Sequence, residues 1–421
     1  MMMVESHAQV NQALASGIHA VPEVSSSFAA AQGAYRFLHN ERITLRALAG
    51  PLIEAARTEA VTACDEWCLV VHDWSQLMYP EHTAKQDRVN LSSRRVPEGY
   101  ELFTQLAVSD RDGSPLAPIG MSLRAADGVH STRTSKLFAP LSPLDEIAPA
   151  MKHADGLSLG KPLVHVIDAE ADSVAHFREW NAEGRFFLVR ADDRIVEWQG
   201  EEQTCTAILQ QLRDEQALVR TREVEYHGKP AEQYVAEVPV RLLRPGQRNR
   251  PEAGDRQRLP GPPLPLRLVF SEVRDEEGKV LAVWRLLTNV PAKVDSSTIA
   301  LWYYWRWQIE KFFKLLKSAG VHAETWQQTT AHAIAARLLI ASMACVVVWR
   351  LARSKHPQAS DARQLLVRLS GRQMKRSRPF TMPAMLAGLW SLLAILAVLE
   401  HYSVEQLQSL SNLILANPQP P

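Results

Sequence analysis

The most informative part of the chain reads Tyr303-Tyr-Trp-Arg306-Trp-Gln-Ile-Glu310-Lys-Phe-Phe-Lys-Leu-Leu-Lys317. Asp295 or Ser296 can cap a helix before this segment and Gly320 can end one after it, so the pattern predicts a single helix of about six turns. The apolar residues of that helix fall on one side at about 100° per residue. They are Trp302, Trp305, Ile309, Phe312, Phe313 and Leu316. This side is expected to pack against a core.

The polar residues of the predicted helix share the opposite side, within about 60° of one another. They are Tyr303, Arg306, Glu310 and Lys317, with Lys314 and Trp307 beside them. Oppositely charged residues four apart are also common on ordinary solvated helices, where each pair adds about 0.2–0.5 kcal/mol. The polar side of this helix, however, combines one carboxylate with several cations and a phenol, and such a surface could bind a polyanion and a metal ion together.

Two acids upstream follow short apolar runs. One run is Trp67–Asp73 and the other is Leu163–Asp168, and each has the pattern of a buried strand that delivers a carboxylate at its tip. An aspartate at the end of a strand is often only a turn former or a helix cap. The case for a functional role of these two aspartates therefore depends on the helix segment described above.

The spacing Y-x2-R-x3-E-x6-K of the helix segment resembles the signature of the YREK group of bacterial insertion-sequence transposases, of the insertion-sequence-four type. These enzymes carry an Asp-Asp-Glu triad on an RNase-H-like core. The resemblance implies that Asp73, Asp168 and Glu310 are the catalytic and metal-ligating residues of this chain. The segment Asp168–Asp172 is similar to the D-x-E-A-D context of the family's second acid, although Ala169 stands where the family often has Arg.

Three carboxylates suit phosphodiester chemistry assisted by two divalent ions, roughly 3.5–4 Å apart, that activate the attacking oxygen and neutralise the leaving oxygen. Mg²⁺ and Mn²⁺ prefer hard oxygen ligands, so the expected cofactor is Mg²⁺, with Mn²⁺ as the alternative. The four cysteines, at positions 64, 68, 205 and 345, have no zinc-site spacing, and the sequence contains neither HExxH nor GxxxxGK(S/T). These features disfavour a zinc hydrolase and a P-loop protein.

The same resemblance implies a set of DNA-binding residues around a nucleotide that is pulled out of the duplex. The phosphate-binding candidates are Tyr303, Arg306, Lys314, Lys317 and Arg190. Trp284, in the predicted strand Val280–Thr288, resembles a family tryptophan that holds the extruded base, and Trp307 resembles the residue that stacks on it. Packing of both tryptophans within the fold is the alternative interpretation.

Near the start of the chain, Ala30–Asn40 resembles the A-x-x-A-Y-R-F-x-x-N segment of these transposases. In the family a longer helical region with arginines precedes this segment and holds the transposon end, whereas the preceding residues here include no Lys or Arg. We therefore expect a shortened end-binding region. A catalytically silent inhibitor that binds DNA or a complete transposase is one alternative, and an RNase-H-like nuclease without strand transfer is another.

The chain has 421 residues, 46% of them hydrophobic, and a formal net charge of only +1, so it is long enough for more than one module and is not basic as a whole. Two segments are locally basic: Arg241–Arg267 has seven Arg against two acids, and Arg350–Arg378 has nine Lys or Arg against one. Both can contact phosphates, although a solvated linker would have the same composition. Few cysteines without pattern and no signal peptide indicate the cytoplasm.

Two apolar runs, Leu338–Trp349 and Pro383–Leu399, raise the possibility of a membrane segment. The first is too short to span a bilayer, and the second is at the lower edge of the required length. Both are interpreted as buried helices of a C-terminal bundle, and no membrane partner is expected. Their remaining apolar surface could serve a dimer.

Strand-like runs followed by alternating strands and helices predict an α/β fold with a mixed sheet flanked by helices, and the resemblance implies that this is an RNase-H-like core. Residues 192–280 alternate as antiparallel strands do, and Pro245–Pro265 is predicted to be a mobile loop among them. The predicted modules are a short helical N-terminal region at 1–60, the core at 61–191 and 281–325, a β-rich insertion at 192–280 and a helical C-terminal region at 326–421.

The sequence thus predicts a DNA transposase that moves an insertion sequence by cut and paste. The expected reactions are metal-dependent nicking at the transposon end, hairpin formation and opening, and strand transfer. The expected partners are double-stranded DNA, as transposon ends and target, and a second copy of the chain in the DNA complex.

Overall fold

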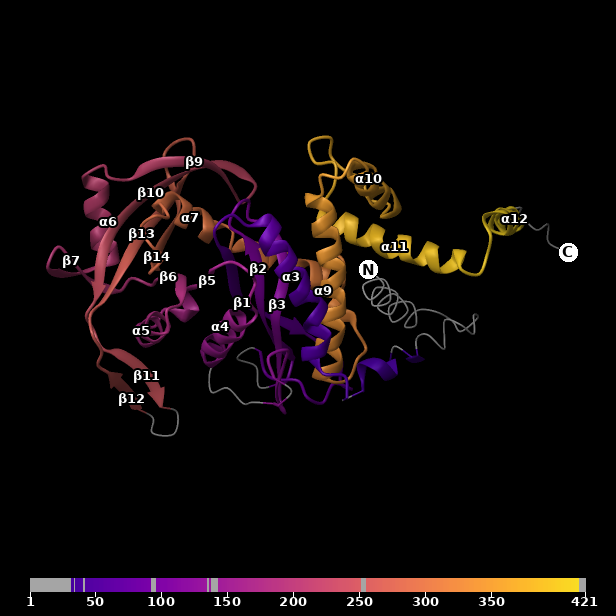
Figure 1. Ribbon diagram of the computed structural model, residues 1–421, viewed down its shortest axis with the longest axis horizontal. Coiled ribbons are helices and arrows are strands. Elements are labelled where there is room, and N and C mark those ends of the chain that lie inside the picture. Colours follow the sequence, from indigo (N-terminus) through magenta and orange to yellow (C-terminus); the bar gives the residue numbers. More distant parts are fainter. Residues whose placement is uncertain are drawn as a thin grey trace. The chain divides into compact units, whose positions relative to one another are not determined.

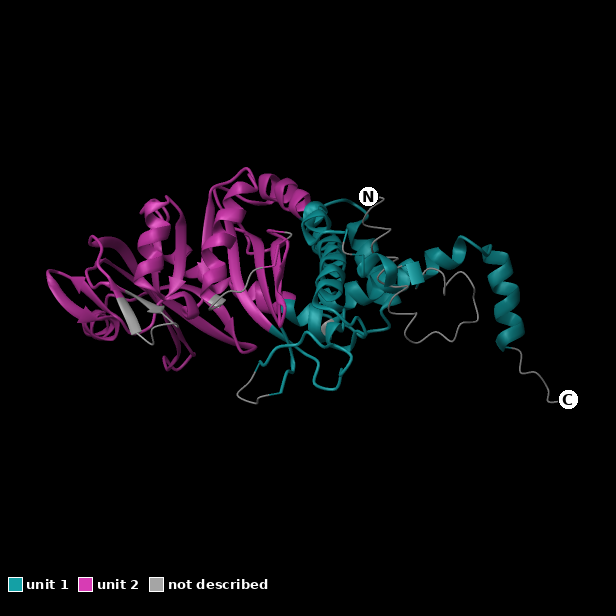
Figure 2. Ribbon diagram, turned by 90° about the horizontal axis from the view of Figure 1, so that it is seen from below, with its two compact units in different colours: residues 1–52, 76–100, 313–421 teal, residues 53–75, 101–312 magenta. Residues whose placement is uncertain are grey.

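The computed structural model describes residues 32–33, 35–40, 42–91, 96–134, 136–137, 143–250 and 255–415. They form two compact units (Figure 2). The larger unit consists of Ile53–Ser75 and Glu101–Phe312, and the smaller unit contains Gln76–Tyr100, the chain up to Leu52 and the chain from Phe313 onward. The segment resembling the family at Ala30–Asn40 lies partly outside the described residues.

A mixed β-sheet is the main feature of the larger unit (Figure 1). Its strand order is β4-β3-β2-β1-β5-β6-β14-β13-β10-β7-β8, with β9 paired to β10. The first six strands are β1 (Cys68–Met78), β2 (Gly99–Ser109), β3 (Pro115–Ala125), β4 (Gly128–Ser131), β5 (Leu163–Ile167) and β6 (Phe186–Arg190). β1, β5 and β6 run parallel, whereas β6–β14 and β2–β3 are antiparallel. The predicted α/β fold with a mixed sheet is therefore confirmed.

Three helices of the larger unit share one hydrophobic core with the sheet. They are α4 (Ile147–Gly156), α5 (Val174–Ala182) and α6 (Cys205–Asp214). Ile147 and Met151 are four apart, as are Ile208 and Leu212, so each pair lies on one helix face and is buried against strands such as β6 and β13. Before β1 the chain forms α3 (Leu45–Ala63), which is longer than the short N-terminal helices that the sequence suggested.

Residues 192–280 form antiparallel strands, as their alternation predicted. The strands are β7 (Ile195–Trp198), β8 (Glu201–Thr204), β9 (Val219–Tyr226), β10 (Lys229–Leu242) and β13 (Leu264–Arg274), and β14 (Val280–Thr288) follows them. β10 pairs with β13 from Glu232↔Arg274 to Leu242↔Leu264 without a shift in register. Because β14 pairs with both β13 and β6, these strands extend the core sheet.

The prediction of a loop at Pro245–Pro265 is wrong in part. β11 (Gly246–Arg250) and β12 (Asp255–Leu259) form an antiparallel hairpin, separate from the main sheet (Figure 1). Prolines and glycines concentrate outside the paired residues, so composition pointed to a loop although the intervening polar residues can pair through their backbones.

The single helix predicted between Asp295 and Gly320 is also wrong in part. The segment forms α7 (Ser296–Tyr304), α8 (Trp307–Lys314) and the π-helical turn η3 (Leu315–Ala319). The Asp295 carboxylate caps α7 by accepting from the Thr298 N–H at 2.9 Å, as the sequence suggested. At the break the backbone bonds join residues three apart: Arg306 to Tyr303, Gln308 to Trp305 and Ile309 to Arg306. The break falls inside the predicted polar stripe, yet Tyr303 and Arg306 both contact Asp168, and Arg306 pairs with Glu310.

Helices make up most of the smaller unit. They are α9 (Ala331–Arg353), α10 (Ala359–Leu369), α11 (Met382–Leu399) and α12 (Val404–Leu415). By length and composition α9 and α11 could each cross a membrane, but 89% of the apolar window of α9 is buried within the structure. α9 is therefore the buried helix predicted from Leu338–Trp349. Only 33% of the window in α11 is buried, so the prediction of a buried helix at Pro383–Leu399 holds mainly for its first half, although Leu393 of the second half is also buried.

Candidate active site

Two neighbouring strands carry the two candidate aspartates. The parallel register of β1 and β5 sets His72 opposite Ile167, so Asp73 and Asp168 come next at the same level of adjacent strands. Asp168 directly follows β5, as predicted. β1 instead continues to Met78, so Asp73 lies within the strand and the prediction that it ends the strand is wrong. Leu77, near the end of this extension, is fully buried.

Arg306 joins all three candidate carboxylates. Its Nη1 lies 2.8 Å from Asp73 Oδ2, and its Nη2 lies 3.3 Å from Asp168 Oδ2 and 2.7 Å from Glu310 Oε1. The Arg306 side chain is only 8% exposed, whereas those of the three acids are 19%, 24% and 36% exposed in the same order. The acids thus remain accessible to solvent while the cation between them is buried.

Two further predicted DNA-binding residues contact Asp168. The Tyr303 hydroxyl donates to Asp168 Oδ1 at 3.3 Å, and Arg190 Nε lies 2.7 Å from the same oxygen. The structure therefore brings Tyr303, Arg306 and Arg190 together with the three acids, although these residues come from a strand end and from both sides of the α7–α8 break.

Burial controls the ionisation of this cluster. It raises the pKa of Asp73 to about 6, against the opposing effects of the Arg306 charge and a hydrogen bond from the Trp74 N–H. It also raises the pKa of Tyr303, and the Asp168 charge adds to this, so the phenol stays protonated and can donate. Burial alone would lower the pKa of Arg306, but the nearby phenol and carboxylates outweigh it and raise the pKa above its usual value. Arg306 is therefore a permanent cation.

A buried histidine pair crosses the same two strands and was not among the predicted site residues. His72 Nε2 and His165 Nδ1 are 2.9 Å apart, and His165 Nε2 lies 3.3 Å from Asp155 Oδ1. Arg185 Nε holds the other oxygen of Asp155 at 2.7 Å. Because the carboxylate only accepts, His165 carries its proton on Nε2, and His72 donates from its own Nε2 to His165 Nδ1.

The histidine pair supports the strands without facing the acids. Burial lowers the pKa of both imidazoles, so the pair is neutral and its protons stay fixed in this chain of hydrogen bonds. Adjacent residues of a strand point to opposite faces, so His72 faces away from Asp73. The signal in the sequence was a histidine within each apolar run that precedes an acid.

The two predicted base-binding tryptophans differ in exposure. Trp307 is 42% exposed, and the Arg306 guanidinium lies 5.9 Å from its ring centroid. Trp284 is 8% exposed, and its ring centroid lies 6.0 Å from that of Tyr303. Trp307 is thus available to a ligand beside the carboxylates, whereas Trp284 packs against the phenol that binds Asp168.

Lys314 and Lys317, the remaining predicted DNA-binding residues, belong to the smaller unit. Lys317 Nζ lies 3.6 Å from Glu324 Oε1, which also accepts from the Met78 N–H at 2.9 Å. Lys314 is exposed. Contact of either lysine with DNA stays a prediction.

The donor set of the cluster fits a hard divalent cation. Asp73, Asp168 and Glu310 offer carboxylate oxygens, the ligand type that Mg²⁺ and Mn²⁺ prefer. The three carboxylates contact two guanidinium groups, those of Arg306 and Arg190, so acids outnumber cations in the cluster even with both arginines present. The two aspartates are held by a parallel strand pair and Glu310 by a helix, which suits a site of fixed geometry.

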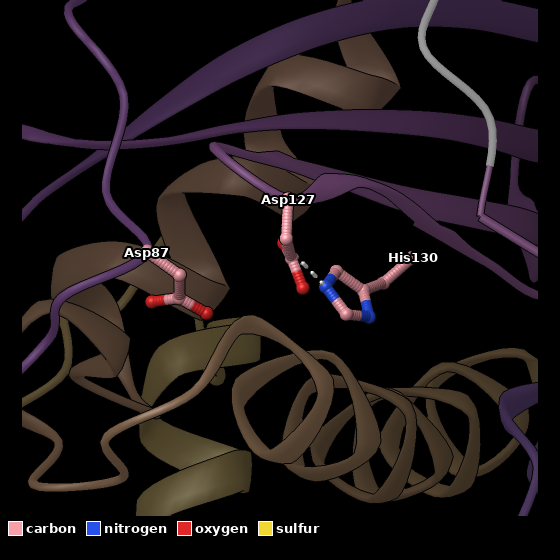
Figure 3. Close-up of side chains that lie close together, drawn as sticks. All are labelled: Asp87, Asp127 and His130. Atoms are coloured by element: carbon pink, nitrogen blue, oxygen red, sulfur yellow. Dashed lines mark hydrogen bonds and ion pairs between the residues drawn. The ribbon is translucent and has the colours of Figure 1, made fainter.

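Another acid–histidine contact of the larger unit has an ordinary structural explanation. His130 Nε2 and Asp127 Oδ1 are 3.1 Å apart across the turn between β3 and β4 (Figure 3). Asp87, drawn in the same figure, belongs to the smaller unit, where it accepts from the Tyr100 hydroxyl at 2.5 Å and caps α9 through the Ala331 N–H at 2.7 Å. The predicted acids are not among these residues.

The family model of the Transposase DDE domain matches residues 106–347. This match includes Asp168 and Glu310 and begins after Asp73. A search of curated proteins gave no match. Since the matched region is more than half of the chain and holds two of the three clustered acids, the protein belongs to the family of transposases defined by this DDE domain.

Proposed function

We propose that this protein excises and inserts a DNA element by cut and paste, with Asp73, Asp168 and Glu310 as its metal-ligating acids. The observation that carries the proposal is the meeting of these three carboxylates, from two strands and a helix, at one guanidinium. Membership in the DDE transposase family supports the assignment of these acids to metal-dependent cleavage and joining of DNA. The YREK group is the proposed subfamily, an RNase-H-like core the proposed fold, and the cytoplasm the proposed location.

Divalent ions, Mg²⁺ in the first place, would supply charge neutralisation and activation of the attacking oxygen when bound to the three acids. Arg306, Arg190 and the Tyr303 hydroxyl would bind phosphate oxygens beside the scissile bond, since all are donors grouped at the acids. The exposed Trp307 ring would stack on an extruded base, and such stacking offsets part of the few kcal/mol that extrusion costs.

The proposed sequence of reactions has four steps. Water first cuts one strand at the transposon end, and the freed 3′-hydroxyl then attacks the opposite strand to give a hairpin. A second water opens the hairpin, and the 3′-hydroxyl finally attacks the target DNA. Two chains acting on two transposon ends would bring both ends to one target.

The test compares charge-neutral variants of similar shape. Asp73→Asn, Asp168→Asn and Glu310→Gln are each expected to lower Mg²⁺-dependent nicking of a DNA duplex carrying the element's own ends by roughly a hundredfold to a thousandfold, because several kcal/mol of transition-state stabilisation is lost. Binding to the same duplex should persist. Asp127→Asn is the matched control, since Asp127 is an exposed acid of the same unit paired with His130.

Two outcomes would change the proposal. Retained nicking in any of the three variants would remove that acid from the catalytic set. Cleavage by the unchanged protein without joining of pre-cleaved ends to a target would indicate a nuclease rather than a transposase.

A further inference from the structure

Arg306 is engaged at both of its terminal nitrogens. Nη1 binds Asp73, Nη2 binds Asp168 and Glu310, and the side chain is 8% exposed. Its Nε is buried without a hydrogen-bond partner among the described residues. A phosphate of bound DNA therefore cannot form the paired bonds typical of arginine while this cluster stays closed.

The oxygens that face Arg306 are the ones that a metal ion would use. Asp73 Oδ1 accepts from the Trp74 N–H at 2.8 Å, and Asp168 Oδ1 accepts from the Ala169 N–H at 2.6 Å. The second oxygen of each aspartate, Oδ2, is bonded to Arg306. A divalent ion and the guanidinium would therefore compete for the same atoms.

We infer that Arg306 is a placeholder for the metal in the DNA-free protein, and that it moves from the three carboxylates to a DNA phosphate when the metal binds. The inference rests on the proposed function. Clustered, partly buried carboxylates are destabilised unless a cation lies near them. In the metal-free protein the Arg306 guanidinium is that cation. A phosphate can then replace the hydrogen bonds that Arg306 gives up.

The backbone around Arg306 permits this movement. Arg306 lies between α7 and α8, where bonds between residues three apart replace the regular helical pattern. Trp307 beside it is exposed, so the neighbouring surface is open to a ligand. DNA and metal are therefore expected to bind cooperatively, each raising the affinity of the other by the same factor.

The test measures Mn²⁺ binding to the DNA-free full chain by electron paramagnetic resonance, which reports free Mn²⁺ and needs no activity. Arg306→Gln is expected to bind Mn²⁺ about tenfold or more tightly than the unchanged protein, because its amide frees the carboxylate oxygens. Arg190→Gln is the matched control. Arg190 is 40% exposed and is bonded to Asp168 Oδ1, so its loss removes the same charge without opening the cluster and should have a much smaller effect.

Equal affinities in Arg306→Gln and the unchanged protein, or equal gains in both arginine variants, would overturn the inference. Glu310→Gln distinguishes this failure from failure of the proposed function. Loss of Mn²⁺ binding in Glu310→Gln without a gain in Arg306→Gln contradicts the placeholder role alone. Binding that is unchanged in both variants contradicts the metal site itself.

The unchanged protein provides a second measurement if Arg306→Gln does not fold. Its Mn²⁺ affinity is compared with and without a saturating short duplex, after subtraction of Mn²⁺ bound by the duplex alone. A gain of about 5–150-fold, the usual range for coupled sites, is expected. An affinity that does not rise with DNA would contradict the inference.

Discussion

The position of Trp305, the residue before Arg306, depends on Gly113 in the turn between β2 and β3. Gly113 has a φ of +69°, and a Cβ atom at this position would lie 2.5 Å from the Trp305 ring. A side chain here would strain the backbone and displace the ring. Gly113 therefore helps to set the break between α7 and α8 at which the guanidinium is presented to the acids.

Gly113→Ala is expected to lower the free energy of unfolding by about 2–5 kcal/mol, combining about 1–2 kcal/mol for a left-handed backbone with about 1–3 kcal/mol for overpacking. Gly184→Ala is the matched control, because Gly184 has a φ of +72° and nothing within 4 Å of an added Cβ. It should lose only the backbone part, about 1–2 kcal/mol. Urea unfolding measures the free energy of unfolding of both variants. Equal losses would show that the Trp305 ring moves aside without a loss of stability.

At the residue scale, the sequence led us to expect the three acids together and the pair of Arg306 with Glu310, four residues on, but not the bonds from Arg306 to the two aspartates. Asp168 and Glu310 lie in recognisable local contexts, and their catalytic roles stay predictions. The bond from Arg306 to Asp73 spans 233 positions and depends on strand register and on the helix break. Spacing along a helix carries no information on such a contact. The His72–His165 bond, between two strands, was missed for the same reason.

At the scale of elements, the β11–β12 hairpin is a basic ribbon tied at its base to α5. Arg178 Nη2 donates to the carbonyl oxygens of Leu242 and Arg244 at 3.2 and 3.1 Å, and its Nε donates to that of Pro262 at 3.0 Å. One guanidinium thus holds both ends of the hairpin. Gly246 also approaches α5 closely, since an added Cβ would lie 2.9 Å from Ala175 Cβ.

The ribbon carries four arginines, at positions 248, 250, 256 and 258. A two-stranded ribbon fits the DNA major groove, and arginines bind phosphates.

Replacing all four arginines of the ribbon by Gln should weaken duplex binding and reduce the slope of log affinity against log salt by about 0.9 for each arginine that contacts a phosphate. Fluorescence anisotropy at several KCl concentrations measures the slope. Arg57→Gln, in an exposed pair with Glu54 on α3, is the control. An unchanged slope in the fourfold variant would exclude the ribbon from the DNA contact.

Elements with a strong local pattern were predictable, and elements set by distant contacts were not. The run of β5, apolar except for His165, and the alternation of β10 determine their strands locally. The hairpin at 246–259 was not predicted, because its polar strands lack an apolar face and are fixed by anchoring to α5. The break after Tyr304 was not predicted either, because Trp305 and Arg306 contact Gly113 and Asp73, which are distant in sequence, whereas helix propensity is local.

At the scale of the whole molecule, charge and exposed apolar surface both favour self-association. The formal net charge of +1 provides little repulsion between copies. Large apolar residues are exposed along the last two helices, α11 and α12, and in the turn between them, and α12 buries none of its residues. The exposed residues are Ile395, Leu396, Val398, Leu399, Tyr402, Val404, Leu410, Leu413, Ile414 and Leu415. Exposed apolar side chains in such number are typical of a protein interface.

The expected partner for this surface is a second copy of the chain, because a dimer would present two sets of acids to two transposon ends. The unchanged protein should sediment as a dimer at micromolar concentration, and the double variant Leu413→Asp with Ile414→Asp should sediment as a monomer, because two charges cannot be buried in an apolar interface without a partner. Val219→Asp, a similarly exposed apolar position at the start of β9, is the control and should leave the dimer intact. Sedimentation velocity distinguishes the species. A double variant that still sediments as a dimer would place the interface elsewhere, and loss of the dimer in Val219→Asp would point to β9.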